Sequence, residues 1–296
     1  MVAIVGGNGV GLNQASLAPL GGRGNLGQSG SNKAGEKTYV NVATGNVVIQ
    51  DNDAVLAGRG DDVSLLRTYN SQGKMSDDNG DAWWINGYRR ITNLTGTLNT
   101  AGSEVQRVGQ DGSVSKFVYD ATRQFYVGVP GNAEFDTLSS DGTTWTWTDT
   151  VSHQTETYQG SNGTWKLATA SDTSGNVTTY SYNGDLLSKI TNANGESVEF
   201  IYTGNNLSQE RIVAADGKVT SNTRYSYDTQ NRLSQVLLDL SPEDASIADG
   251  KVYVTSYTYV GAGNLIDSIT QTDGSYQKFT YVTVDGEARV ASITDA

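Results

Sequence analysis

The chain has 296 residues, enough to bury a sizeable core in one large or two ordinary β domains without help from a metal. Its formal net charge of −12 repels nucleic-acid phosphates and anionic membrane surfaces, so we expect neither as a partner. It contains no cysteine, which excludes disulfides and thiol catalysis, and no run approaches the ~18 apolar residues of a membrane-spanning helix.

Residues 1–36 are rich in Gly, Asn, Gln and Ser and contain little that could pack into a core. We expect a flexible lead-in, or a segment threaded against another part of the protein. The Gly-rich stretch at 6–11 lacks the G-x-G-x-x-G pattern and the following helix of a dinucleotide loop, so no cofactor is expected. The opening residues also lack the basic region of a secretion signal.

Residues 37–170 alternate between strand and turn signals at irregular spacing. Two runs of β-forming residues, 38–42 and 47–49, flank a Gly-Asn turn and predict a hairpin. Later segments such as 143–148 alternate with period two, which is typical of half-buried antiparallel strands. The abundance of Gly (35) and Tyr (16) favours short strands joined by tight turns, and we expect little helix.

Residues 171–296 repeat one pattern five times. Each unit has a turn glycine, a strand that ends in aromatic-x-aromatic, a second turn, and a closing pair of apolar residues. The aromatic pairs are Tyr180/Tyr182, Phe200/Tyr202, Tyr225/Tyr227, Tyr257/Tyr259 and Phe279/Tyr281. The closing pairs are Leu187/Ile190, Leu207/Ile212, Leu233/Val236, Leu265/Ile269 and Val290/Ile293. A recurring unit of this length predicts a repeat architecture of stacked β-hairpins, with the acidic insertion 241–250 between the strands of one unit.

The aromatic pairs predict a two-faced strand. Residues i and i+2 share a face, so the two rings of each pair should point together into the core. The residue between them should face away, and it carries a hydroxyl in four units, with Ile201 as the exception. We therefore expect the rings to form the structural row of the repeats, and the hydroxyl face to be wet.

The unit Gly175-Asn-Val-Thr-Thr-Tyr-Ser-Tyr-Asn-Gly-Asp-Leu-Leu-Ser-Lys-Ile190 resembles the YD repeat of Rhs proteins, toxin-complex B and C subunits and teneurins. The segment Tyr225-Ser-Tyr-Asp-Thr-Gln-Asn-Arg-Leu233 carries the name-giving Tyr-Asp pair. Upstream, Val40-Asn-Val-Ala-Thr-Gly-Asn46 and Leu65-Leu-Arg-Thr-Tyr-Asn-Ser71 look like the opening of an Rhs core. By this resemblance, residues 37–170 are the opening region and residues 171–296 the tandem YD repeats.

The resemblance implies an all-β fold in which antiparallel hairpin repeats wind into a spiral, curved β-sheet that forms part of a shell. In that family the shell encloses an effector, so the implied function is structural and non-enzymatic. The implied partners are the remainder of a parent Rhs-type protein and its effector cargo. The implied location is secreted or on the bacterial cell surface, by a route without a visible N-terminal signal peptide. No toxin domain or self-cleaving protease region is recognised, so a fragment of a larger protein is expected.

Catalytic motifs are sparse. The single histidine, His153, is placed in an alternating strand and is interpreted as a surface or cross-strand residue, and no Gly-x-Ser-x-Gly elbow is present. A distant pair of carboxylates for glycoside hydrolysis stays open as a third hypothesis. The oxygen-rich segment 77–81 has calcium-loop chemistry, but it lacks the full twelve-residue pattern and is interpreted as an acidic turn.

A binding module is the second hypothesis. Trp83, Trp84, Trp145 and Trp147 would contact a glycan if their faces were exposed, although core packing is favoured because Trp145 and Trp147 share one strand face. The acidic loop near Glu243 and Asp244 is an alternative contact for a protein or receptor.

Overall fold

The computed structural model confirms an all-β fold built from antiparallel hairpins. It describes residues 3–5, 36–41, 44–59, 62–73, 79–110, 112–129, 135–244 and 246–296. The regular structure of these residues is strand, apart from two 3-10 turns, η1 (Asn86–Tyr88) and η2 (Pro242–Asp244). Most of the Gly-rich segment 1–36 lies outside the described residues, so the expectation of a flexible lead-in is not addressed there.

Five strands form a separate inner sheet in the order in which they occur along the chain. They are β1 (Ala3–Val5), β2 (Lys37–Asn41), β3 (Asn46–Leu56), β4 (Val63–Asn70) and β5 (Trp83–Ile85). The pair β2–β3 is the hairpin that the sequence predicts around its Gly-Asn turn, with Tyr39 opposite Val48. β1 pairs with β2 in parallel and the other neighbours are antiparallel.

The next eight strands close into a ring. They are β6 (Arg90–Thr95), β7 (Glu104–Val108), β8 (Val114–Asp120), β9 (Phe125–Gly128), β10 (Thr137–Ser140), β11 (Thr144–Thr148), β12 (Thr155–Ser161) and β13 (Thr164–Ser171). Each strand pairs with the next, and the first half of β13 pairs with β6 to complete the circle. Every strand sends at least one buried apolar side chain inward, with Trp145 and Phe117 among the largest. The ring is therefore filled by its own core.

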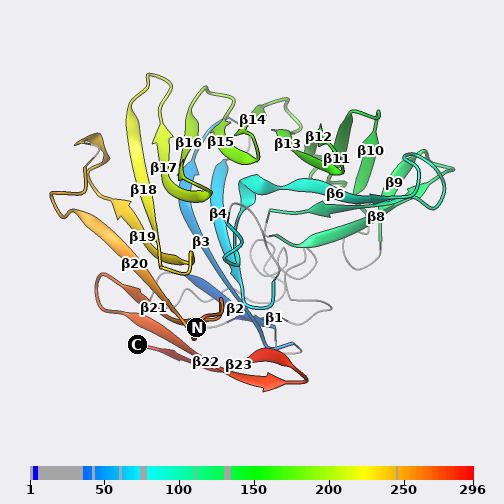
Figure 1. Cartoon of the computed structure of the whole chain (residues 1–296). Coiled ribbons are helices and arrows are strands. Elements are labelled where there is room, and N and C mark those ends of the chain that lie inside the picture. The colour runs from blue at the N-terminus through cyan, green and yellow to red at the C-terminus, as the bar shows by residue number, and fades with distance from the viewer. Residues whose placement is uncertain are drawn as a thin grey trace.

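The second half of β13 starts a long antiparallel ladder. Its strands are β14 (Val177–Asn183), β15 (Leu186–Thr191), β16 (Ser197–Thr203), β17 (Asn206–Val213), β18 (Val219–Tyr227), β19 (Leu233–Asp239), β20 (Val252–Tyr259), β21 (Ile266–Gln271), β22 (Tyr276–Val284) and β23 (Glu287–Asp295). Each predicted repeat is one hairpin of this ladder, from β14–β15 to β22–β23. Figure 1 shows the ladder curving around the inner sheet, with the ring to one side. The main core lies between the concave face of the ladder and the inner sheet.

The acidic insertion lies elsewhere than the sequence suggested. Residues 241–250 connect β19 to β20, and these strands belong to successive hairpins. The insertion therefore separates two repeats and does not divide one. Its fold is local: the Ser241 hydroxyl donates a 2.9 Å hydrogen bond to the carboxylate of Asp249.

Candidate functional site: the concave face and its buried carboxylates

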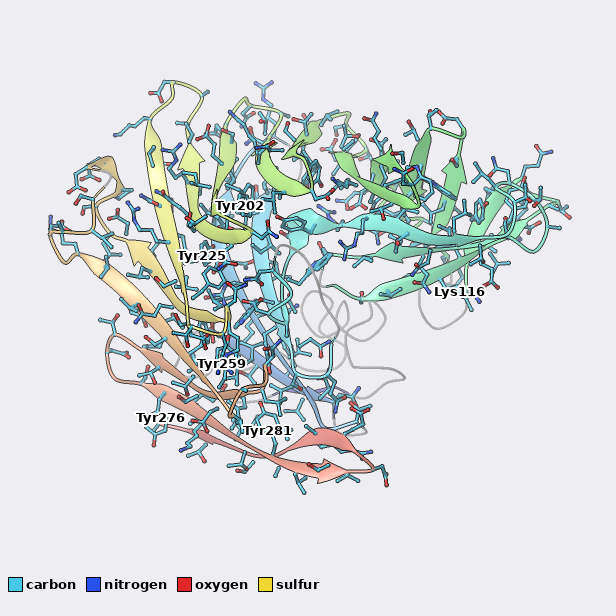
Figure 2. All side chains as sticks on the ribbon, viewed as in Figure 1. Lys116, Tyr202, Tyr225, Tyr259, Tyr276 and Tyr281 are labelled. Atoms are coloured by element: carbon cyan, nitrogen blue, oxygen red, sulfur yellow. The ribbon has the colours of Figure 1, made fainter. Side chains whose placement is uncertain are left out.

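The structure places the ten repeat aromatics on the concave face of the ladder. Figure 2 labels Tyr202, Tyr225, Tyr259 and Tyr281 along the side that faces the inner sheet. The first ring of each pair is deeply buried in four repeats, and the others are partly buried against the same core. All five intervening residues are exposed on the convex face: Ser181, Ile201, Ser226, Thr258 and Thr280.

A β-bulge recurs at the same place in all five hairpins, just before the second aromatic residue. There the returning strand carries one extra residue: Ser188, Ser208, Ser234, Asp267 or Ala291. The three serines each donate a hydrogen bond of 2.9 to 3.0 Å to the carbonyl of the intervening residue across the pair. Bulges bend a strand and increase its twist, so five equivalent bulges bend the ladder repeatedly in one sense.

The bulge also explains the spacing of the closing apolar pairs and corrects two of them. In an unbroken strand, residues i and i+3 face opposite sides of the sheet. The extra residue of the bulge lies between them and shifts the alternation by one, so both side chains face the core. The residue opposite the second aromatic and the residue opposite the first are always three apart. These pairs are Leu187/Ile190, Leu207/Glu210, Leu233/Val236, Ile266/Ile269 and Val290/Ile293. Opposite the first aromatic the structure places Glu210 where the sequence predicted Ile212, although Ile212 also packs against the main core. Opposite the second aromatic it places Ile266 where the sequence predicted Leu265.

The second aromatic is tyrosine in every repeat, and its hydroxyl always has a partner. Tyr182 donates to the carbonyl of Gly87 at 3.2 Å and Tyr202 lies 2.7 Å from the hydroxyl of Tyr88, both in η1, whereas in the last three repeats the hydroxyl reaches the preceding hairpin. Tyr227 donates to the carbonyl of Leu207 at 3.0 Å, and Tyr259 donates to that of Leu233 at 2.6 Å. Tyr281 donates in the same way to the carbonyl of Ile266, at 2.9 Å. A phenylalanine could pack there but could not donate. These hydrogen bonds link each of the last three repeats to its predecessor, and those of Tyr182 and Tyr202 link the first two repeats to η1.

The first aromatic is either tyrosine or phenylalanine, and its hydroxyl has a different role. Where it is tyrosine, the hydroxyl meets a charged side chain. Tyr180 accepts a 2.7 Å hydrogen bond from Arg89, Tyr225 donates to Asp53 at 2.8 Å, and Tyr257 donates to Glu36. Phe200 and Phe279 occupy this position in the two remaining repeats. The concave face therefore carries two clusters of buried charge.

A sixth unit, which the sequence analysis missed, lies in the ring. The hairpin β12–β13 has the same bulge, between Thr157 and Tyr158, and Tyr158 faces Leu167. The first aromatic position is occupied by Glu156, so this hairpin lacks the aromatic-x-aromatic pattern of the other five. The repeat geometry thus begins inside the ring and continues into the ladder.

Glu156 is fully compensated. Its carboxylate accepts hydrogen bonds from Arg89, from Arg107 at 2.6 Å, and from the hydroxyl of Tyr158. Burial opposes the charge, but the two guanidinium groups outweigh it and lower the pKa of Glu156 to about 2. A polar pocket of about 210 Å³ lies beside this cluster, lined by residues that include Arg89, Glu156 and Tyr180. The polar groups of this cluster mainly form hydrogen bonds with one another.

The second cluster, here named the carboxylate seam, consists of Glu36, Asp51, Asp53, Arg67 and Glu210. It lies where β3 and β4 of the inner sheet meet the ladder. Arg67 binds Asp53 with two hydrogen bonds of 2.7 and 3.0 Å, and its guanidinium lies 4.5 Å from the ring centroid of Trp83. Arg67 also donates to the hydroxyl of Tyr257 at 2.9 Å. Glu36 and Asp51 lie 3.6 and 3.8 Å from the same guanidinium.

The seam contains more acid than base, and burial opposes ionisation. Burial raises the pKa of Glu36 to about 7 despite the attraction of Arg67. The pKa of Asp51 is also raised, mainly by burial and then by Asp53. Burial and the charge of Asp53 hold the pKa of Glu210 well above its usual range.

Glu210 is the most unusual residue of the seam. It faces Phe200 at the position where the other four hairpins of the ladder carry Ile or Val. It is 2% exposed, and neither carboxylate oxygen has a hydrogen-bond partner among the described residues. An uncompensated acid in a core position costs free energy, so packing alone does not explain it.

The four tryptophans are buried and pack within the two cores. Trp83 and Trp84 are 3% and 1% exposed, and Trp145 and Trp147 are 0% and 4% exposed. A glycan platform needs an open aromatic face, and these rings do not provide one. Arg107 covers Trp147 at 3.7 Å from the ring centroid, and Trp145 packs edge to face on Trp165.

The remaining candidates are His153 and the acidic turn at 77–81. His153 is exposed in the turn before β12 with φ of 59°, and so it is not in a strand as the sequence suggested. No group of three or more His, Asp or Glu residues in the described ranges is arranged to hold a metal ion. Residues 77 and 78 of the acidic turn lie outside those ranges, whereas Asp81 accepts hydrogen bonds from the backbone N–H groups of Trp83 and Leu233. No described helix is long and apolar enough to span a bilayer.

The strand pairing defines an all-β protein of tandem hairpins wrapped around an inner sheet. Comparison with protein-family models adds one match, to the domain of unknown function DUF6531, over residues 37–117. This region runs from β2 to β8. None of the curated proteins compared with the chain matches it.

Several solved structures have a partial likeness to the chain. A Photorhabdus luminescens Tc holotoxin pore is 12% identical, with a TM-score of 0.44, over 86% of this chain and 16% of that one. The N-terminal domain of the effector protein SpvB from Salmonella typhimurium is 13% identical, with a TM-score of 0.33, over 83% and 99%. A TcdB2-TccC3 complex without its hypervariable C-terminal region is 13% identical, with a TM-score of 0.35, over 86% and 16%. The chain thus spans less than a fifth of the Tc toxin chains. All three TM-scores are below 0.5, and the fold of this chain is defined by its own strand pairing.

Proposed function

We propose that this chain is a wall segment of an Rhs-type shell, and that the shell encloses or displays an effector or toxin domain. The observation that supports it is the ladder itself, in which five equivalent hairpins are each bent by a bulge at the same place and the last three are each tied to the preceding hairpin by a tyrosine hydroxyl. Such a ladder can extend by adding repeats without changing its curvature. The resemblance of the repeats to YD repeats supports the same reading.

The proposed role is mechanical and non-enzymatic. The buried carboxylates tie the inner sheet to the ladder, and Glu36, Asp53, Glu156 and Glu210 are enclosed by the core. A glycosidase needs two carboxyl groups on either side of a substrate bond, with access for the sugar. We propose the remainder of a parent protein and its effector as partners, and a secreted or cell-surface location.

Protease protection of the full-length gene product tests this proposal. We expect a segment downstream of residue 296 to resist protease while the wall is intact. In a variant with Tyr227→Ala, which removes an inter-repeat tie, that segment should be cut faster, whereas Ser226→Ala on the convex face should leave it protected. Equal and rapid cleavage of the segment in all three proteins would contradict enclosure.

A further inference from the structure

The two charged clusters of the concave face differ in one decisive respect. Near the ring, a single buried carboxylate, Glu156, lies between two guanidinium groups. In the carboxylate seam, the three buried carboxyl groups of Glu36, Asp53 and Glu210, together with Asp51, whose side chain is 39% exposed, have one guanidinium, that of Arg67. In the first cluster the ionised carboxylate has two cationic partners, so its negative charge is fully compensated. The second is balanced only if some of its acids are neutral.

The seam is also one of the places where the inner sheet and the ladder share polar contacts, another being the hydrogen bond from the Tyr69 hydroxyl to the carbonyl of Asn264. The hydroxyl of Tyr225, on β18, donates to Asp53 on β3 at 2.8 Å. Arg67, on β4, donates to the hydroxyl of Tyr257 on β20 at 2.9 Å. Each of these hydrogen bonds involves a charged residue of the seam, Asp53 or Arg67. Any change in charge there acts directly on the attachment of β3 and β4 to the ladder.

Ionisation of the surplus acids is only partly compensated inside the seam, where Glu36 accepts a hydrogen bond from Tyr257 and lies 3.6 Å from Arg67. Asp53 already occupies Arg67 with two hydrogen bonds, and Glu36 and Glu210 are 0% and 2% exposed. A buried, unpaired carboxylate is costly unless water reaches it. Water can reach these carboxylates only if the inner sheet separates locally from the ladder.

We propose that the carboxylate seam is a pH-operated latch, which holds β3 and β4 on the ladder in acidic solution and releases them as the solution becomes alkaline. Its parts come from every element at the junction: Glu36 and Lys37, Asp51 and Asp53 of β3, Arg67 of β4, Glu210 of β17, Tyr225 of β18 and Tyr257 of β20. The latch opens locally while the ring stays closed, because Glu156 is paired at all of these pH values.

The direction of the effect follows from linkage. The pKa of Glu36 is raised from 4.5 to about 7, and that of Glu210 is also raised, so the folded seam binds more protons than the unfolded chain. The stabilisation is complete below the ordinary pKa near 4.5 and is lost as the pH rises through the folded pKa. The side chains of Arg67, Tyr225 and Tyr257 keep their protons in this range, because their pKa values are raised.

Hydrogen exchange of this chain, followed by mass spectrometry at pH 5.5, 7.0 and 8.5, tests the latch. Rates are corrected for the intrinsic pH dependence of exchange, and peptides from β11 and β12 in the ring serve as the internal reference. The key variant is Glu210→Ile, which gives β17 the residue type found at this position in other repeats. Glu210→Gln keeps the shape of the side chain and is the alternative if the Glu210→Ile variant does not fold. Glu199→Gln is the matched control, since Glu199 forms surface ion pairs with Lys189 and Arg211.

The expected result is a loss of protection confined to peptides of β3, β4, β17 and β18. It should exceed tenfold between pH 5.5 and 8.5, since one pKa unit corresponds to about tenfold. Either Glu210 variant should reduce this loss clearly, and Glu199→Gln should retain it. Protection in the seam that does not change with pH, or a loss that persists undiminished in the Glu210 variants, would overturn the proposal. A loss shared equally by the ring would also overturn it, because that would be global unfolding.

Discussion

The inter-repeat tie of Tyr227 gives a prediction whose magnitude can be worked from the structure. Its ring packs against the main core, and its hydroxyl donates a 3.0 Å hydrogen bond to the carbonyl of Leu207 in the preceding hairpin. Tyr227→Ala removes both and should lower the free energy of unfolding by about 3 to 5 kcal/mol. Tyr227→Phe removes only the hydroxyl and should cost about 1 to 3 kcal/mol, because a partly buried carbonyl loses a partner.

Ser226 is the matched control, one residue away on the convex face. Its side chain is exposed, so Ser226→Ala should change stability by about 0.5 kcal/mol or less. Equilibrium unfolding in urea, followed by circular dichroism, measures all three variants against the parent chain. The reasoning fails if Ser226→Ala and Tyr227→Ala give similar midpoints, or if Tyr227→Phe is as stable as the parent.

The remaining predictions concern the bulge, the ring and the charged clusters. Ser234→Ala should cost about 1 kcal/mol in urea unfolding, because its hydroxyl bridges the bulge to the carbonyl of Ser226 at 3.0 Å, and an unchanged midpoint would show that the serine is incidental. Glu156→Gln should cost about 3 to 5 kcal/mol, since it leaves two buried guanidinium groups without their carboxylate; a neutral outcome would mean that water already screens them. Thermal melts of the parent chain should show the free energy of unfolding falling by about 3 kcal/mol between pH 4.5 and 7 as Glu36 ionises. Stability should also fall in strong acid as Glu156 is protonated. A flat profile from pH 4.5 to 8 would contradict the burial of Glu36.

The sequence predicted the repeats well because their signal is local. Period-two alternation places Tyr225 and Tyr227 on one face and Ser226 on the other, and the turn glycines mark the ends of the hairpins. The bulge leaves a signal in the sequence as well, because in four of the five hairpins two core apolar residues are three apart within one strand. An apolar pattern alone predicts Ile212, which does pack against the core, and passes over Glu210, which occupies the position opposite Phe200.

The charged clusters could not be predicted because their members come from distant parts of the chain. Arg67 and Tyr257 are 190 residues apart, and Tyr225 and Asp53 are 172 apart. Nothing near Glu210 in the sequence marks it as buried, since a glutamate in a polar-rich strand is ordinarily exposed. The closure of β6 on β13 also depends on a long-range pairing that no local pattern encodes.

Electron cryo-microscopy of the full-length gene product tests the central claim most directly. The account predicts that the ladder β14–β23 forms a continuous stretch of wall around a closed chamber, with the hydroxyls of Tyr227, Tyr259 and Tyr281 tying successive hairpins and with protein density inside. A structure in which the ladder is an isolated stalk, or in which its repeats bound no enclosed space, would contradict it.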